Sequence, residues 1–368
     1  MFPFVQSPDS LEQRRQLQRQ RLHHRVQLQT RQIERVMDER RLPAQVSGGV
    51  IDAHTIQFDL QAQLQGSWEW IRGLTADFRQ ALGVPQLSVT RENGRLQVSV
   101  ARPVEAPVRL LDVLAMGVEV GEETAVIGLS YEGEPVLLPL QEHILISGIE
   151  NAGKTSLIRS IAMSLALSNR QSRLQQVIIA PVIPGNNTIS DLKPLTLLPH
   201  MSAHIAFRLE EAVQILNWLV EEMENRLQWG ERKPVVILMI DQVVELMEAG
   251  GQMVEEAVTK LLQRGVEAGI HLILTTARPQ SPRLDTHLKA NLPVRIIGQT
   301  EDSIQADAAS GIKNSEAEYL RGHGDFLLIH DGRQLFFQSA YISDYDLHLC
   351  LKKLLRKYKI SILAQPYL

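Results

Sequence analysis

The chain has 368 residues, of which 44% are hydrophobic and 22% charged, a composition that excludes a disordered or fibrous protein. Its length exceeds that of one ordinary domain, so we expect two or more modules. No stretch of about 18 apolar residues predicts a membrane span, and the first residues do not resemble a secretory signal. The one cysteine, Cys350, excludes an internal disulfide and indicates a reducing compartment, which we expect to be the cytoplasm.

Charge is distributed unevenly along the chain, whose net charge is −4. Residues 1–110 contain 15 Arg, no Lys and 11 Asp or Glu, a net charge of +4, and the remainder carries −8. The positive excess lies in residues 1–47, because residues 48–110 contain 6 Arg and 6 acidic residues.

Residues 1–47 are predicted to form one basic, Arg- and Gln-rich helix. Residues 9–42 contain no Gly or Pro, and Leu22, Val26, Ile33 and Val36 follow helical spacing. Its arginines suit contact with DNA phosphates or with a protein partner. The alternative is a solvated helix that packs on a neighbour through its narrow apolar stripe.

Residues 48–110 are predicted to form a small α/β domain of β-α-β-β order. Alternating residues at 56–60 indicate a strand, and a helical stretch follows near 67–82. Two further alternating runs are joined by Glu92-Asn93-Gly94, which predicts a hairpin because Asn-Gly suits its tight turn.

Residues 111–350 are predicted to form an α/β domain with a mostly parallel sheet, and a basic tail, 351–368, follows. Short apolar runs alternate here with helical stretches, as in sheets covered on both faces. The runs are 144–146, 177–179, 235–240, 271–274, 294–297 and 326–329.

A phosphate-binding loop is predicted between the first of these runs and a helix over 156–167. The segment from Gly148 to Thr155 matches G-x-x-x-x-G-K-T. Amides of such a loop and the helix start bind phosphates, Lys154 contacts the β- and γ-phosphates, and the Thr155 hydroxyl ligates Mg²⁺. The predicted ATP-binding residues are Gly148, Asn151, Ala152, Gly153, Lys154, Thr155 and Ser156.

Asp241 follows the apolar run 235–240 and is the second residue predicted to bind Mg²⁺, which it would hold through water. Its alternative role is to cap the helix that follows.

Four motifs follow the phosphate-binding loop along the chain, in this order: Ile240-Asp241-Gln242, Ala268 to Pro279 (A-G-I-H-L-I-L-T-T-A-R-P), Asn291 to Ile296 (N-L-P-V-R-I) and Gly322-His323-Gly324-Asp325. This order resembles the motor domain of the FtsK/SpoIIIE family of double-stranded DNA translocases. The resemblance covers about residues 50–350. It implies a RecA-like P-loop ATPase core behind a small ring domain, assembled as a hexameric ring that pumps duplex DNA with ATP.

The resemblance also implies that an arginine of the neighbouring subunit reaches the γ-phosphate. Arg295 is the best match for that role and Arg278 the second, because a planar, always charged guanidinium stabilises a transferring phosphoryl group. The alternative for each arginine is a surface ion pair.

The chain departs from the family pattern around the nucleotide. Gln242 stands where the family has a catalytic Glu, and an amide cannot act as a base. Glu245, one helical turn later, is the candidate substitute. Ala277 replaces a Gln, Ala180-Pro181-Val182 replaces Asp-Pro-Lys, and residues 299–312 lack the family's S-R-T arginine. We also expect neither the family's membrane anchor nor its winged-helix module.

Three functions remain open at this stage. The leading one is a soluble, ring-forming DNA translocase or DNA-binding ATPase, in which Lys154, Asp241, Gln242, Arg295 and Arg278 serve catalysis. An alternative is a hydrolysis-impaired ATP-binding scaffold that partners an active motor. A third, a single-stranded or protein substrate, is disfavoured by the 5% aromatic content, which offers few stacking platforms. Candidate contacts to duplex DNA are Arg264, Arg283 and Lys289.

Overall fold

The computed structural model describes residues 26–42, 44–51, 55–62, 67–84, 87–92, 95–101, 107–130, 133–182, 189–313, 315 and 317–358. The chain separates into two compact units, of which the smaller is Val5–Ala106 and the larger includes Pro107–Leu368. Each unit is described by itself below. No described helix is both long enough and apolar enough to cross a lipid bilayer.

The smaller unit is a four-stranded antiparallel sheet covered by helices. Its strands follow the order β1-β2-β4-β3. They are β1 (Ala44–Ile51), β2 (Thr55–Ala62), β3 (Leu87–Glu92) and β4 (Arg95–Ala101), and the helices are residues 26–39, α2 (Ser67–Gly73) and α3 (Thr75–Leu82). The predicted hairpin is confirmed, since β3 and β4 pair from Glu92 and Arg95 outward.

Strand β1 was not predicted, because its two glycines indicated the break after the N-terminal helix. A Cβ at Gly49 would lie 2.1 Å from the carbonyl oxygen of Gln57 on β2, so glycine here permits close strand pairing. The boundary expected between residues 47 and 48 falls inside this strand.

Of the expected N-terminal helix, the structure describes a helix over 26–39, and the arginine-rich stretch before it lies outside the described residues. Ile33, Val36 and Met37 of this helix are buried in the same core as Phe58 of β2 and Phe78 of α3. The helix therefore packs through its apolar stripe as part of the small unit.

The larger unit contains a nine-stranded mixed sheet, ordered β6-β5-β13-β12-β11-β7-β10-β9-β8. The strands from β11 to β8 are parallel, and the pairs from β6 to β11 are antiparallel. The strands are β5 (Thr124–Ser130), β6 (Pro135–Pro139), β7 (Ile144–Ser147), β8 (Leu174–Ile179), β9 (Val235–Ile240), β10 (Ile270–Thr276), β11 (Val294–Ile297), β12 (Asp325–His330) and β13 (Arg333–Ser339).

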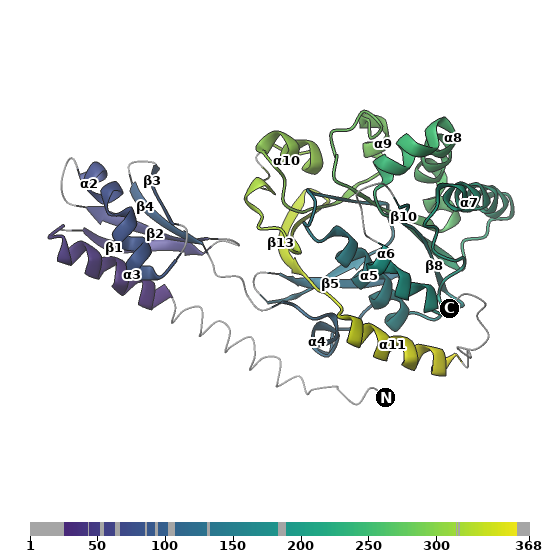
Figure 1. Ribbon diagram of the computed structural model, residues 1–368, viewed down its shortest axis with the longest axis horizontal. Coiled ribbons are helices and arrows are strands. Elements are labelled where there is room, and N and C mark those ends of the chain that lie inside the picture. The colour runs from purple at the N-terminus through teal and green to yellow at the C-terminus, as the bar shows by residue number, and fades with distance from the viewer. Residues whose placement is uncertain are drawn as a thin grey trace. The chain divides into compact units, whose positions relative to one another are not determined.

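Helices cover both faces of this sheet, as the continuously apolar strands require (Figure 1). On one face, α4 (Leu110–Leu114), α5 (Lys154–Ser168) and α11 (Asp344–Lys357) share a core with Ile144 and Ile146. On the other, α7 (Leu209–Trp229) and α8 (Val243–Arg264) pack with Leu145. The shorter helices are α6 (Ile189–Leu192), η1 (Lys193–Leu197), η2 (Val266–Ala268), α9 (Thr286–Ala290), α10 (Ser303–Ser310) and η3 (Ala317–Tyr319).

The expected α/β fold is confirmed, and all six apolar runs lie in strands β7 to β12. The basic tail expected from residue 351 begins inside α11, whose Leu351 and Leu354 are buried in the core. Because β7, β9, β10 and β11 run parallel, their carboxyl ends meet at one edge of the sheet, and this edge carries the candidate site.

Candidate nucleotide-binding site

The predicted phosphate-binding loop connects β7 to α5 and is held by two neighbouring loops. The amide of Ile149 donates to the carbonyl of Gln299 at 2.8 Å, and the amide of Gly324 donates to the carbonyl of Ala152 at 2.8 Å. Asn151 and Gly153 have positive φ values of 62° and 103°. A Cβ at Gly153 would lie 2.7 Å from the Gly324 nitrogen, so only glycine suits this position.

The start of α5 has the properties of an anion site. Gly153 is its N-cap and has no side chain that could accept a hydrogen bond from the first turn. The amides of that turn have no intrahelical acceptor, and the helix dipole adds positive potential. A phosphate group therefore suits the space in front of this turn. All seven predicted ATP-binding residues lie in this loop or in the first turn of α5.

Lys154 folds back over the loop. Its Nζ donates to the carbonyl oxygens of Gly148 and Ile149, both at 2.7 Å. Burial lowers the pKa of the Lys154 ammonium, although the charges of Asp241, Glu245 and Glu150 oppose this shift. The Lys154 ammonium therefore lies beside the anion site. A phosphate bound there could take the place of the two carbonyl groups as its hydrogen-bond partner.

Asp241 lies at the carboxyl end of β9 between two hydroxyl groups. Thr155 Oγ1 donates to its Oδ2 at 3.0 Å, and Thr275 Oγ1 donates to its Oδ1 at 2.5 Å. Asp241 is buried, and desolvation raises the pKa of its carboxyl group. A hydroxyl and a carboxylate side by side next to the phosphate-binding loop are the oxygen ligands that Mg²⁺ takes in P-loop proteins, so these residues suit the ion.

Thr275, which lies one residue before the end of β10, next to the strand that Asp241 follows, was not identified from the sequence. In a parallel sheet such neighbouring ends lie together, and the tertiary pairing of β10 with β9 places the hydroxyl here.

Gln242 connects β9 to α8 in a left-handed conformation, with φ 59° and ψ 58°. Its backbone amide donates to Thr275 Oγ1 at 2.9 Å, which fixes the residue after Asp241. Its side chain does not cap α8.

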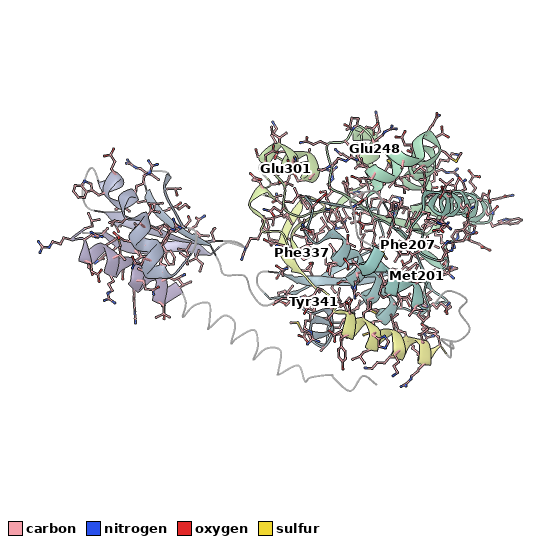
Figure 2. The ribbon with its side chains drawn as sticks, in the orientation of Figure 1. Met201, Phe207, Glu248, Glu301, Phe337 and Tyr341 are labelled. Carbon is pink, nitrogen blue, oxygen red and sulfur yellow. The ribbon has the colours of Figure 1, made fainter. Side chains whose placement is uncertain are left out.

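Arg278 forms ion pairs with two acidic side chains of α8. Its Nε donates to Glu245 Oε1 at 3.1 Å, and its two terminal nitrogens donate to the Glu248 carboxylate at 2.9 and 2.6 Å. Glu248, which is labelled in Figure 2, lies on α8. These hydrogen bonds raise the pKa of Arg278. In this structure Arg278 thus forms the surface ion pair that was the alternative to a role at the γ-phosphate.

Arg295 lies apart from the phosphate-binding loop. On β11 it is in register with Leu145, three residues before Gly148, which corresponds to about 10 Å along the sheet. Its guanidinium is half-buried, burial lowers its pKa, and its hydrogen bonds are two long ones of 3.5 Å to the carbonyls of Ala309 and Lys289. Among the described residues, no carboxylate forms an ion pair with Arg295.

The three candidate DNA contacts differ in their surroundings. Arg264 is exposed at the end of α8, at the edge where β10 begins. Arg283 forms an ion pair with Glu255. Lys289 is partly buried, and desolvation together with the charge of Arg295 lowers its pKa.

Sequence comparison identifies relatives of this chain. A profile of the FtsK/SpoIIIE family matches residues 113–229 and 226–281. The DNA translocase SftA of Bacillus subtilis (strain 168) is 30% identical over 249 residues, which are 61% of this chain and 25% of that protein. The DNA translocase FtsK of Mycobacterium tuberculosis (strain H37Rv) is 29% identical over 278 residues, 66% of this chain and 32% of that protein. The chain thus spans about a quarter to a third of the curated relatives that it matches.

Solved structures share the fold at lower sequence identity. The conjugation coupling protein TcpA of pCW3, solved as a monomer with ATPγS, has a TM-score of 0.65 and 18% identity, with 90% of this chain and 99% of that chain covered. The cytoplasmic domain of the type VII secretion ATPase EccC of Thermomonospora curvata has a TM-score of 0.57 and 20% identity, with 68% and 34% covered. Residues 113–281 of this chain therefore match the FtsK/SpoIIIE family model, and the chain shares the fold of these solved ATPase structures.

Proposed function

We propose that this chain is an ATP-driven motor that acts on double-stranded DNA as a ring, in the cytoplasm. The observation that carries the proposal is that the start of α5, which has no side-chain cap, lies next to the hydrogen-bonded pair Thr155 and Asp241. The chain also matches the FtsK/SpoIIIE family model, and its relatives are named DNA translocases. The amides of the loop and Lys154 bind the phosphates, and Thr155 and Asp241 hold Mg²⁺. When bound, the ion neutralises phosphate charge.

A ring is supported by the place of Arg295. Arg295 lies about 10 Å along the sheet from the subunit's own phosphate-binding loop, and the described residues offer its guanidinium no carboxylate. Such an arginine suits the γ-phosphate bound by a neighbouring subunit, where it would stabilise the charge of the transferring group. Arg278 suits this role less well, because three hydrogen bonds hold it within its own subunit. We propose a hexamer, as the family resemblance implies.

Duplex DNA is the proposed substrate, with Arg264 and Lys289 as the first contacts to test and Arg283 as a weaker one, since Glu255 neutralises its charge. The arginine-rich residues before position 26 are a proposed accessory contact to DNA or to a protein partner.

A second candidate function is a scaffold that binds ATP without hydrolysing it. Gln242 favours it, because the amide after Asp241 cannot accept a proton.

Phosphate release with and without duplex DNA tests the motor proposal, with Lys154→Ala as the negative control and Gln242→Glu as the comparison. DNA-stimulated turnover by the unmodified chain, lost in Lys154→Ala, supports the motor and removes the scaffold. ATPγS binding without turnover, with turnover gained only in Gln242→Glu, supports the scaffold. Failure to bind ATPγS contradicts both.

A further inference from the structure

A carboxylate other than the residue after Asp241 lies near the phosphate-binding loop. Glu245 is in the first turn of α8, and its charge acts on the pKa of both Lys154 and Asp241. The Glu245 side chain is therefore close to the groups that would hold the nucleotide and Mg²⁺.

The two oxygens of the Glu245 carboxylate have different surroundings. Oε1 accepts the hydrogen bond from Arg278 Nε at 3.1 Å. Oε2 is buried and has no hydrogen-bond partner among the described residues. An unpartnered buried carboxylate oxygen costs free energy, and native structures satisfy most such atoms. This oxygen is therefore available to a group that arrives with the substrate.

Arg278 holds Glu245 in this orientation. The same guanidinium binds both oxygens of Glu248, one turn further along α8, in a bidentate pair. A bidentate pair fixes the plane of the guanidinium, so the remaining Nε–H is directed at Glu245 Oε1. Glu248 and Arg278 together limit the rotation of the Glu245 carboxylate and leave Oε2 unengaged.

We propose that Glu245 supplies the catalytic carboxylate that Gln242 cannot provide, with Arg278 as its positioning residue. The inference rests on the proposed ATPase function. Glu245 Oε2 accepts a proton from the attacking water as the water oxygen bonds to the γ-phosphorus. The bond between the γ-phosphorus and the bridging oxygen breaks, ADP retains the electron pair, and Glu245 later releases the proton to solvent. Gln242 orients the water through its amide.

Single-turnover ATP hydrolysis with excess protein and duplex DNA tests this assignment, alongside ATPγS affinity. Glu245→Gln keeps the side-chain shape, and we expect its rate to fall about 10²–10⁴-fold with ATPγS affinity unchanged, because a general base contributes about that factor. The matched control is Glu256→Gln, the same change at an exposed position of α8, which we expect to leave the rate unchanged. A thermal melt of each variant verifies folding.

Arg278→Lys and Glu248→Gln test the positioning role. Each keeps Glu245 but loosens its orientation, so we expect an intermediate loss of rate, with ATPγS affinity unchanged. A purely structural ion pair would lower the melting temperature and leave the hydrolysis rate of the folded protein unchanged.

The outcomes separate this inference from the proposed function. Unchanged hydrolysis in Glu245→Gln overturns the inference and leaves the ATPase standing. An unmodified chain that binds ATPγS but does not hydrolyse ATP also overturns the role of Glu245. Absence of ATPγS binding overturns the proposed function itself.

Discussion

The close contact at Gly153 predicts that the phosphate-binding loop tolerates no side chain at this position. Its φ of 103° lies outside the left-handed region of other residues, and a Cβ would lie 2.7 Å from the Gly324 nitrogen and 3.0 Å from its Cα. Both neighbours are backbone atoms, so no side-chain rotation relieves the clash. Gly153→Ala therefore requires the two loops to separate.

Gly230, at the end of α7, is the matched control. Its φ of 68° and ψ of 26° are left-handed, and a Cβ there would meet nothing within 4 Å. Gly230→Ala should cost about 1–2 kcal/mol of unfolding free energy, the penalty of a left-handed L-residue. Gly153→Ala adds overpacking of about 1–3 kcal/mol, divided between folding and nucleotide binding.

The measurements are urea unfolding and ATPγS titration of both variants. If the full difference of about 1–3 kcal/mol falls on binding, ATPγS affinity drops roughly 5–150-fold in Gly153→Ala and not in Gly230→Ala. The reasoning is refuted if Gly153→Ala matches Gly230→Ala in both unfolding free energy and affinity.

Three further predictions follow from charges and titrations. Burial raises the pKa of Asp241 in the folded state, so ionisation of this carboxyl group destabilises the fold as the pH rises above 3.8. Asp241→Asn should therefore raise the free energy of unfolding measured in urea at pH 7.5. The same variant should weaken Mg²⁺-dependent ATPγS binding. Burial lowers the pKa of His143 and His271 from 6.5 to about 4, so the folded state binds fewer protons than the unfolded state in this window. As the pH falls from 6.5 to about 4, the free energy of unfolding should decrease by about 1.4 kcal/mol per pH unit for each histidine. The double variant His143→Gln/His271→Gln should lack this contribution to the slope. Arg264→Gln should reduce the slope of log affinity for duplex DNA against log salt by about 0.9, and an unchanged slope would remove Arg264 from the DNA contacts.

The parallel part of the sheet was predictable because its residues carry a strong local signal. The apolar run at 235–240 coincides with β9, since strands buried on both faces need apolar side chains at every position. The phosphate-binding loop was predictable for a related reason, because its glycine, lysine and threonine spacing has few other uses.

The antiparallel part was harder to predict. Strands β5 and β13 pair with each other although about 200 residues separate them, and β13 has several exposed side chains, so it lacks the continuous apolar pattern. Strand β1 was hidden by glycines that serve close pairing with β2.

In the candidate site, too, some residues could be predicted from the sequence and others could not. Lys154, Thr155 and Asp241 were predicted from spacing, and the structure brings them together. The partners of Arg278 were not predictable, because Glu245 and Glu248 lie about 30 residues away and meet it only through the pairing of α8 with the end of β10. Whether an arginine pairs with carboxylates of its own chain is a tertiary property that its motif does not encode.

Movement along duplex DNA is the central claim, and displacement of a triplex-forming oligonucleotide tests it most directly. A third strand bound at the far end of a linear duplex reports a motor that travels there. The account predicts displacement with ATP and Mg²⁺, no displacement with ATPγS, and none by Lys154→Ala, which lacks the ammonium at the phosphates. ATP hydrolysis by the unmodified chain without any displacement would contradict the account.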